Sequence, residues 1–180
     1  MEAEDRDAGF TLIELMISMG LFALIAVAGL ALVDGIINVQ GRTDGRLDRL
    51  AAIQRSLFLV ESDIEQVAPG RIAGGGAEIR FTRTAPGIGG VPVELRYAGA
   101  AGSLVRSGGP IAQQVLDGVA SVRWRFWDGG WIDRWPASEA ARDRWPRAVA
   151  LEMQVAGPNG APVSVRRVVT LPDQPREDEQ

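Results

Sequence analysis

The feature that most constrains this chain is an uncharged run of nineteen residues near its N-terminus, LMISMGLFALIAVAGLALV, from Leu15 to Val33. With Phe10 to Ile13 added, the apolar stretch covers about 24 residues interrupted only by Glu14, enough to cross a hydrocarbon core of roughly 30 Å. A secretory signal would carry a basic leader and an A-x-A cleavage site, whereas this leader is acidic and Asp34-Gly35 follows the apolar run. We therefore predict a membrane-spanning or assembly helix over 10–34, with a plain signal anchor as the alternative.

Glu14 is the unusual residue of this segment. A carboxylate this far inside a membrane helix costs about 2.5–3.5 kcal/mol on insertion scales, and it normally marks a function and has a specific partner. Cleavage of the chain between Gly9 and Phe10 would create an α-amine on Phe10. That amine is a cation with which a neighbouring Glu14 can pair inside an assembly.

The run Gly9-Phe10-Thr11-Leu12-Ile13-Glu14 resembles the class III signal of type IV pilins and type II secretion pseudopilins. In that superfamily a prepilin peptidase cuts after the glycine and N-methylates the new N-terminal phenylalanine, and the glutamate directs docking against a neighbour's amine. The resemblance implies a cleaved leader over 1–9, N-methylation of Phe10 and an assembly role for Glu14. It also implies a single-pass inner-membrane protein with its head in the periplasm. The leader departs from the usual basic pattern in being acidic.

Downstream, apolar residues recur at spacings of three and four, which predicts one apolar stripe of an α-helix: Leu47, Leu50, Ile53, Leu57, Val60, Ile64 and Val67. Polar residues between them, Asp63 included, are expected on the wetter faces. Pro69-Gly70 is a helix stop. We predict a soluble amphipathic continuation of the helix over 35–69. Bending or fraying is expected where glycine costs about 1 kcal/mol relative to alanine, at Gly35, Gly41 and Gly45.

From residue 70 the pattern changes to a period of two, which is typical of half-buried strands. It is found at 78–83, 93–97, 122–126, 149–155 and 163–171. Gly74-Gly75-Gly76 is interpreted as a loop, since no helix start or lysine follows it. The predicted fold class is α+β: a long N-terminal hydrophobic, pilin-like helix packed on the antiparallel β-sheets of a C-terminal head. The head covers 70–172 and a polar tail 173–180.

Five tryptophans fall within 22 residues: Trp124, Trp127, Trp131, Trp135 and Trp145. One interpretation is an aromatic platform for a carbohydrate or a protein partner. The other places Trp124 and Phe126 in the core and the remaining rings in an ordered loop, because clustered tryptophans near a hairpin often close a small core. We favour the second, and we keep Trp127, Trp131 and Trp135 as candidate partner contacts if they are exposed.

Composition excludes several kinds of chemistry. The chain has no histidine, cysteine or lysine, and all 19 basic residues are arginine, which excludes thiolate nucleophiles, imidazole bases, Schiff bases and the usual zinc sites. The arginines of the strands are expected on a solvated face. No catalytic residue, cofactor or metal is predicted, and the net charge of −4 gives no reason to expect a nucleic-acid partner.

Two alternatives rest on carboxylates. A membrane-anchored carboxylate-dependent enzyme such as a glycosidase would draw on Asp117, Asp128, Asp133 and Glu139. Oxygen ligands for Ca²⁺ lie between Asp128 and Asp143, although their spacing matches no loop motif and solvated charges are the simpler interpretation.

The C-terminal half resembles one family in particular. Its segments VLDGV at 115–119, RFWDGGW at 125–131 and WPRAVALE at 145–152 are similar to the signature of the minor pseudopilin family GspJ of type II secretion systems. That resemblance implies a structural subunit that joins the I- and K-type minor pseudopilins, with an H-type pseudopilin below, at the pseudopilus tip. The tip complex is expected to initiate pseudopilus assembly, to support protein export across the outer membrane and to meet secreted substrates. A minor pilin of a type IV pilus or DNA-uptake machine is the alternative.

Overall fold

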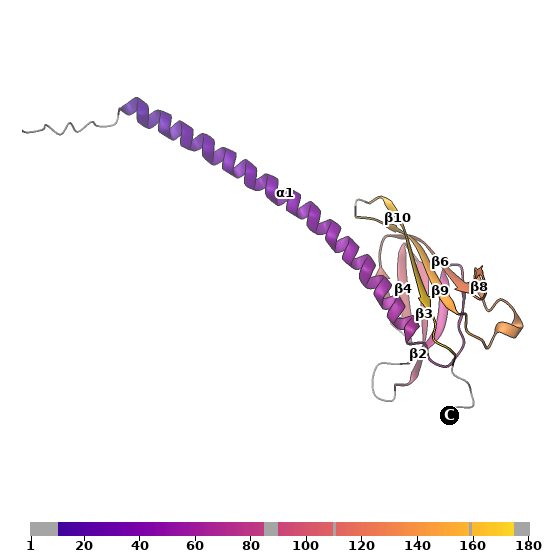
Figure 1. Cartoon of the computed structure of the whole chain (residues 1–180). Coiled ribbons are helices and arrows are strands. Elements are labelled where there is room, and N and C mark those ends of the chain that lie inside the picture. The colour runs from indigo at the N-terminus through magenta and orange to yellow at the C-terminus, as the bar shows by residue number, and fades with distance from the viewer. Residues whose placement is uncertain (1–10, 85–89, 110, 159, 175–180) are drawn as a thin grey trace, which may run out of the picture. The chain divides into compact units, whose positions relative to one another are not determined.

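The structure, a computed structural model, describes residues 11–84, 90–109, 111–158 and 160–174. One α-helix, α1 (Leu12–Glu65), precedes a series of β-strands (Figure 1). The chain divides into two compact units, Met1–Gly45 and Arg46–Gln180, so α1 contributes to both. A long N-terminal hydrophobic helix followed by antiparallel sheets confirms the predicted α+β class.

The first unit consists, in its described part, of the N-terminal portion of α1. Its residues are exposed from Thr11 to Gly41, and the large apolar side chains among them are more than half exposed. Within the described ranges, α1 is the helix that is long and apolar enough to cross a membrane. The expected fraying is wrong, because α1 is continuous through Gly35, Gly41 and Gly45. A cost of about 1 kcal/mol per glycine weakens a helix without breaking it.

The second unit, the head, contains two antiparallel sheets with the strand orders β5-β4-β3-β2-β1-β8 and β10-β9-β6-β7. The predicted strands correspond to β2, β3, β6, β9 and β10, and the other five strands were not predicted. In chain order the elements are β1 (Ala73–Gly75), β2 (Glu78–Thr84), β3 (Pro92–Ala100), β4 (Ser103–Gly108), β5 (Ile111–Leu116), β6 (Val119–Trp127), β7 (Trp131–Ile132), β8 (Arg134–Trp135), the 3-10 helix η1 (Glu139–Ala141), β9 (Ala148–Ala156) and β10 (Pro162–Thr170).

The core of the head is one cluster built from α1 and both sheets. Of the predicted stripe, Ile53, Leu57, Val60 and Ile64 are buried, whereas Leu47 and Leu50 are exposed. The sheets supply the largest fully buried side chains, each hiding roughly 150–250 Å² from water: Phe81, Tyr97, Trp124, Phe126 and Trp135. The buried hydrophobic residues of the described chain all lie between Ile53 and Leu171. The head therefore carries its own core.

The glycine run at 74–76 is not the predicted loop. Gly74 and Gly75 belong to β1, which pairs with β2 on one side and with β8 on the other. A Cβ on Gly74 would lie 2.6 Å from the carbonyl oxygen of Glu78, and one on Gly75 would lie 3.0 Å from that of Asp133. Gly74 and Gly75 thus lie in a strand where close backbone approach leaves no room for a side chain, whereas Gly76 follows the strand with a positive φ of 59°.

Candidate functional site

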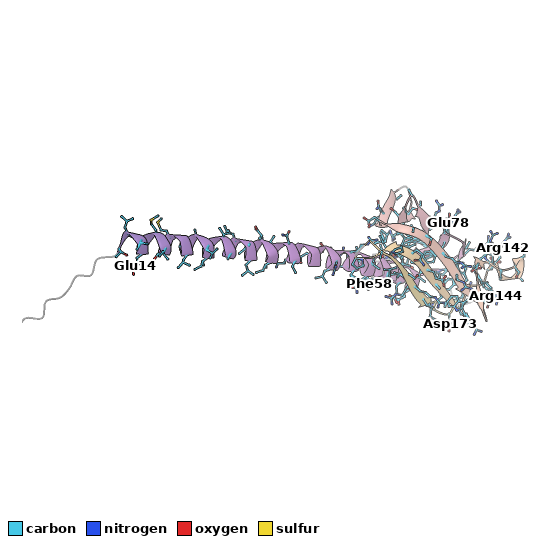
Figure 2. The ribbon with its side chains drawn as sticks, turned by 90° about the horizontal axis from the view of Figure 1, so that it is seen from above. Glu14, Phe58, Glu78, Arg142, Arg144 and Asp173 are labelled. Atoms are coloured by element: carbon cyan, nitrogen blue, oxygen red, sulfur yellow. The ribbon has the colours of Figure 1, made fainter. Side chains whose placement is uncertain are left out.

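Glu14 lies in the first turn of α1, three residues after Thr11, which caps the helix (Figure 2). The Glu14 backbone N–H donates to the Thr11 carbonyl oxygen at 3.1 Å and to the Thr11 hydroxyl at 3.4 Å. The Thr11 hydroxyl in turn donates to the Glu14 carboxylate at 3.4 Å. This is a Thr-x-x-Glu capping arrangement. The carboxylate is exposed on an otherwise apolar surface and open to a partner from outside the chain.

The predicted cleavage and methylation site, Gly9 and Phe10, lies outside the described residues. Cleavage after Gly9, methylation of Phe10 and the assembly role of Glu14 stay predictions.

Two of the three candidate contact tryptophans share the outward face of the sheet that contains β6. Trp127 pairs with Trp131 across β6 and β7, and their rings meet edge to face with centroids 5.4 Å apart. The Arg166 guanidinium lies 5.0 Å and that of Arg125 6.0 Å from the centroid of the Trp131 ring. Both tryptophans are partly exposed. Because tryptophan and arginine are enriched at interface hot spots, Trp127 and Trp131 remain candidate contacts.

Trp135 is different, and its interpretation as a contact residue is corrected. Its side chain is 1% exposed, its indole N–H donates to the carbonyl oxygen of Arg144 at 3.1 Å, and its ring packs against Phe126. A buried indole offers no contact surface. Trp124 and Phe126 are fully buried, as predicted.

Each of the carboxylates considered for catalysis or Ca²⁺ binding forms an ion pair with at least one arginine. Within the described ranges no group of three or more His, Cys, Asp or Glu residues is placed to hold a metal ion. The loop from Asp128 to Asp143 therefore assembles no carboxylate cluster among its described side chains. Arg142 of this loop and Arg144, which directly follows it, are labelled in Figure 2. The ion pairs are Asp117–Arg49, Asp128–Arg144, Asp133–Arg123, Asp133–Arg125, Glu139–Arg142 and Asp143–Arg71.

A buried ionic cluster that sequence reasoning missed surrounds Asp63 of α1. The side chain of Asp63 is 0% exposed, and its carboxylate accepts hydrogen bonds from the Tyr97 hydroxyl at 2.5 Å and the Arg106 Nε at 2.5 Å. Arg83 also donates to it, and donates to the side-chain oxygen of Gln66 at 2.9 Å. The cluster joins α1 to β2, β3 and β4. Burial, with a contribution from the bond to Asp63, raises the pKa of Tyr97 well above its ordinary value.

Two expectations are corrected by this cluster. The sequence predicts Asp63 on a solvent-facing side of the helix and the strand arginines on a solvated face of a sheet. In the structure Asp63 is buried, and Arg83 and Arg106 are largely buried. A signal was present in the sequence. Asp63 lies three residues after Val60 and one before Ile64, so it borders the apolar stripe on the helix surface. Arg80 and Arg96, which pair with Glu78, are about half exposed as expected.

A second polar anchor holds α1 near the start of the head. Arg49 donates from Nε to the Ala156 carbonyl oxygen at 2.7 Å and from its two terminal nitrogens to the side chain and the carbonyl oxygen of Asp117, at 2.5 and 2.9 Å. The guanidinium thereby bridges the β5–β6 turn and the end of β9. Sequence reasoning did not identify this residue, because its partners are 68 and 107 positions away.

Comparisons with known proteins agree with both parts of the chain. A family model described as type II secretion system (T2SS), protein J matches residues 31–171, and a model of the prokaryotic N-terminal methylation motif matches residues 5–30. The type II secretion system protein J of Klebsiella pneumoniae is 26% identical over 66 residues, which are 37% of this chain and 33% of that relative. The match thus spans a third of the relative's length.

The fold is shared with one chain of a crystal structure, the GspK-GspI-GspJ complex of the enterotoxigenic Escherichia coli type 2 secretion system. The TM-score is 0.55 at 20% identity, over 71% of this chain and 99% of that one. The model of protein J covers most of the present sequence, including the C-terminal part of α1 and the strands of the head. The chain therefore belongs to the protein J family of type II secretion systems.

Proposed function

We propose that this chain is a structural, non-catalytic minor pseudopilin of the pseudopilus tip, which initiates pseudopilus assembly and supports protein export across the outer membrane. The observation that carries the proposal is the pairing, in one chain, of a methylation motif over 5–30 with a protein J match over 31–171. The family match favours a secretion system over a type IV pilus or a DNA-uptake machine.

At the membrane end, the proposal assigns chemistry to three residues. A prepilin peptidase removes the leader after Gly9 and methylates Phe10, and the exposed Glu14 carboxylate pairs with an α-amine inside the assembly. An ion pair offsets the cost of holding a carboxylate among apolar side chains. The apolar part of α1 anchors the protein in the inner membrane as a single span, with the head in the periplasm.

At the head, the proposed partners are I- and K-type minor pseudopilins, with an H-type pseudopilin below them. The likeness to a chain of the GspK-GspI-GspJ complex supports the I- and K-type partners through the shared fold. Secreted substrates are the further proposed partners, and Trp127 and Trp131 are the candidate contacts because their rings are partly exposed beside arginines.

The processing step is tested by mass spectrometry of protein extracted from membranes that contain active prepilin peptidase. The expected N-terminus is N-methylated Phe10. Recovery of a chain that still begins at Met1 would contradict the assignment of the leader.

The assembly role is tested with a head fragment that begins at Arg46, since the head carries its own core. The fragment should co-purify with the soluble heads of the I- and K-type pseudopilins of the same secretion system. A mixture of the three heads that elutes as separate monomers at micromolar concentration would contradict the tip assignment.

A further inference from the structure

β10 is the outer strand of its sheet, with β9 as its one neighbour there (Figure 1). It spans nine residues, all paired with β9 in an unbroken register. The other outer strands of the described head are shorter or irregular. β7 and β8 have two residues each, and β5 has six and pairs with β4 through a register shift. A long, regular edge is a template for pairing with another chain.

The bonds at the two ends of the β9–β10 ladder reveal which backbone groups of β10 face outward. The Gly157 N–H donates to the carbonyl oxygen of Ala161, and the Leu171 N–H donates to that of Arg147. Hydrogen-bonded pairs alternate along an antiparallel ladder, so the odd-numbered residues of β10 bond to β9. The N–H and C=O groups of the even-numbered residues point away from it: Ser164, Arg166, Val168 and Thr170. Within the described ranges these groups have no backbone partner.

Apolar side chains flank this edge on both sides of the strand. Val168 is 43% exposed on the outward face, and Val163 is 40% exposed on the face toward the core. On α1, Phe58 is 71% exposed (Figure 2). It lies one turn before Glu61, whose carboxylate is 3.8 Å from Nε of Arg167 on β10. A strand added to β10 would cover apolar surface as well as gain backbone hydrogen bonds.

The positive charge of β10 indicates which kind of strand can pair with it. β10 carries Arg166 and Arg167 and no acidic residue. Three antiparallel registers pair most of β10 with a second copy of itself, and they are centred on Val165, Arg166 or Arg167. The two that are centred on an arginine, including the one that pairs the whole strand, set that arginine opposite its own copy, which is destabilising. A strand with carboxylates at these positions avoids the repulsion and forms cross-strand ion pairs.

We infer that the free edge of β10 accepts an acidic β-strand from another pseudopilin head, which extends the β10-β9-β6-β7 sheet across the contact. This inference rests on the proposed function and names the surface through which part of that function operates. Backbone hydrogen bonds join the two chains, and the side chains of Arg166 and Arg167 determine which strand pairs with β10 and in which register.

Residue-resolved hydrogen exchange of the head fragment tests the inference, with the I-type and K-type heads as probes. In the free head, the amides of Ser164, Arg166, Val168 and Thr170 exchange fast and those of Val163, Val165, Arg167 and Val169 exchange slowly. In the complex, the even-numbered amides should slow by at least about tenfold. A complex whose even-numbered amides still exchange fast overturns the inference and leaves the proposed function standing. Failure to form any complex overturns both. Protection of the same amides in the head alone at high concentration identifies a second copy as the occupant instead.

A matched pair of variants separates the backbone from the side chain. Val168→Pro removes an outward N–H that β9 does not use, and proline is tolerated on edge strands for that reason. Loss of one net hydrogen bond predicts about tenfold weaker binding of the partner head. Val168→Thr keeps the N–H and should bind within about twofold of the parent. Equal binding by both variants would contradict the ladder.

A separate variant tests the role of the Arg166 charge. This test does not depend on the folding of Val168→Pro. Arg166→Glu leaves every backbone group in place and should weaken partner binding, whereas the same change at the half-exposed Arg96, on the other sheet, should not. Unchanged binding by Arg166→Glu would overturn the acidic assignment. Slow exchange of the odd-numbered amides of β10 confirms that each variant is folded.

Discussion

The two portions of α1 differ in whether the chain itself covers their apolar side chains. In the head, apolar residues form one stripe, and Ile53, Leu57, Val60 and Ile64 of that stripe are buried by the head's own sheets. In the first unit, apolar side chains surround the helix and are exposed. A helix that is apolar all round needs lipid or other helices to cover it. The head is thus complete within one chain, whereas the first unit requires an environment or an assembly.

The same contrast holds for the carboxylates Glu14 and Asp63. Each lies on α1 among apolar residues. Asp63 is buried and receives hydrogen bonds from three strands, while Glu14 is exposed and bonded to the adjacent Thr11. A carboxylate that its own fold satisfies contributes to stability, and one that the fold leaves accessible is free to act between chains. Four predictions, ordered by their effect on the stability of the head, test this division.

Asp63→Ala is expected to have the largest effect. It leaves Arg83 and Arg106 without their shared anion, and breaking a buried ion pair costs about 3–5 kcal/mol of unfolding free energy. Urea denaturation of the head fragment measures the loss. Asp48→Ala, at an exposed position on the same helix, is the control and should change stability by less than about 0.5 kcal/mol. A loss below about 1 kcal/mol for Asp63→Ala would show that the cluster is not a stabilising element.

The next effect appears at alkaline pH. The folded pKa of Tyr97 is raised by burial and by Asp63, while in the unfolded chain it is about 10. Above that pH the unfolded state loses a proton that the folded state keeps. The contribution of Tyr97 to stability is therefore constant below a pH of about 10, and above it stability falls by up to about 1.4 kcal/mol per pH unit.

Because of the composition of the chain, other side chains do not interfere with the titration of Tyr97. The chain has one tyrosine and no lysine, cysteine or histidine, so in the unfolded chain Tyr97 is the side chain that titrates between about pH 8 and 12. Tyrosinate absorbance should rise near pH 10 in denaturant and stay low at that pH in the folded head. Tyr97→Phe should abolish the alkaline loss of stability. A native midpoint near pH 10 would place Tyr97 in contact with water.

Arg49→Ala is expected to have a smaller effect. It removes three hydrogen bonds to Asp117 and Ala156 at a partly exposed site, which corresponds to about 1–2 kcal/mol. Arg49→Lys should recover little of this, because lysine lacks the planar fork that reaches several acceptors at once. Thermal melts of the two variants and of Arg46→Ala, at an exposed neighbouring position, measure the difference. Full recovery of stability in Arg49→Lys would show that the ion pair with Asp117 accounts for the whole effect of Arg49.

Glu14→Gln is expected to leave the stability of the head unchanged and to act on assembly alone. It keeps the size of the side chain and removes the charge, so the variant should insert into the membrane and be processed, yet lose most of its crosslinking to neighbouring pseudopilins. Glu14→Leu should behave in the same way. Thr11→Val removes the hydroxyl of the cap but keeps the carboxylate, and should still assemble. Normal crosslinking by both Glu14 variants would contradict the pairing mechanism.

The parts of the fold that the sequence predicted are those with a repeating pattern. The apolar stripe predicted the buried side of α1, and alternation located the five long strands. The parts that it missed depend on contacts between distant segments. The burial of Asp63 requires Tyr97, Arg83 and Arg106 from three strands to meet at one point, and the glycines of β1 are explained by backbones that approach from β2 and β8. Residue types alone also did not separate the buried Trp135 from the partly exposed Trp131, because the two lie in short strands of different sheets, β8 and β7, and burial depends on which side of each strand faces the core.

The two polar anchors of α1 also fix the axial position of its C-terminal portion within the head. Arg49 and Asp63 are fourteen positions apart, about 21 Å along the helix axis, and they bond to different strands. A slide of the helix by one turn, about 5.4 Å, would restore the periodicity of the apolar stripe but would separate both charged groups from their acceptors and donors at once. Apolar packing alone tolerates several axial positions, and the anchors reduce them to one. The anchors therefore prevent the C-terminal portion of α1 from sliding within the head, so a force applied along the helix axis acts on the head as a whole.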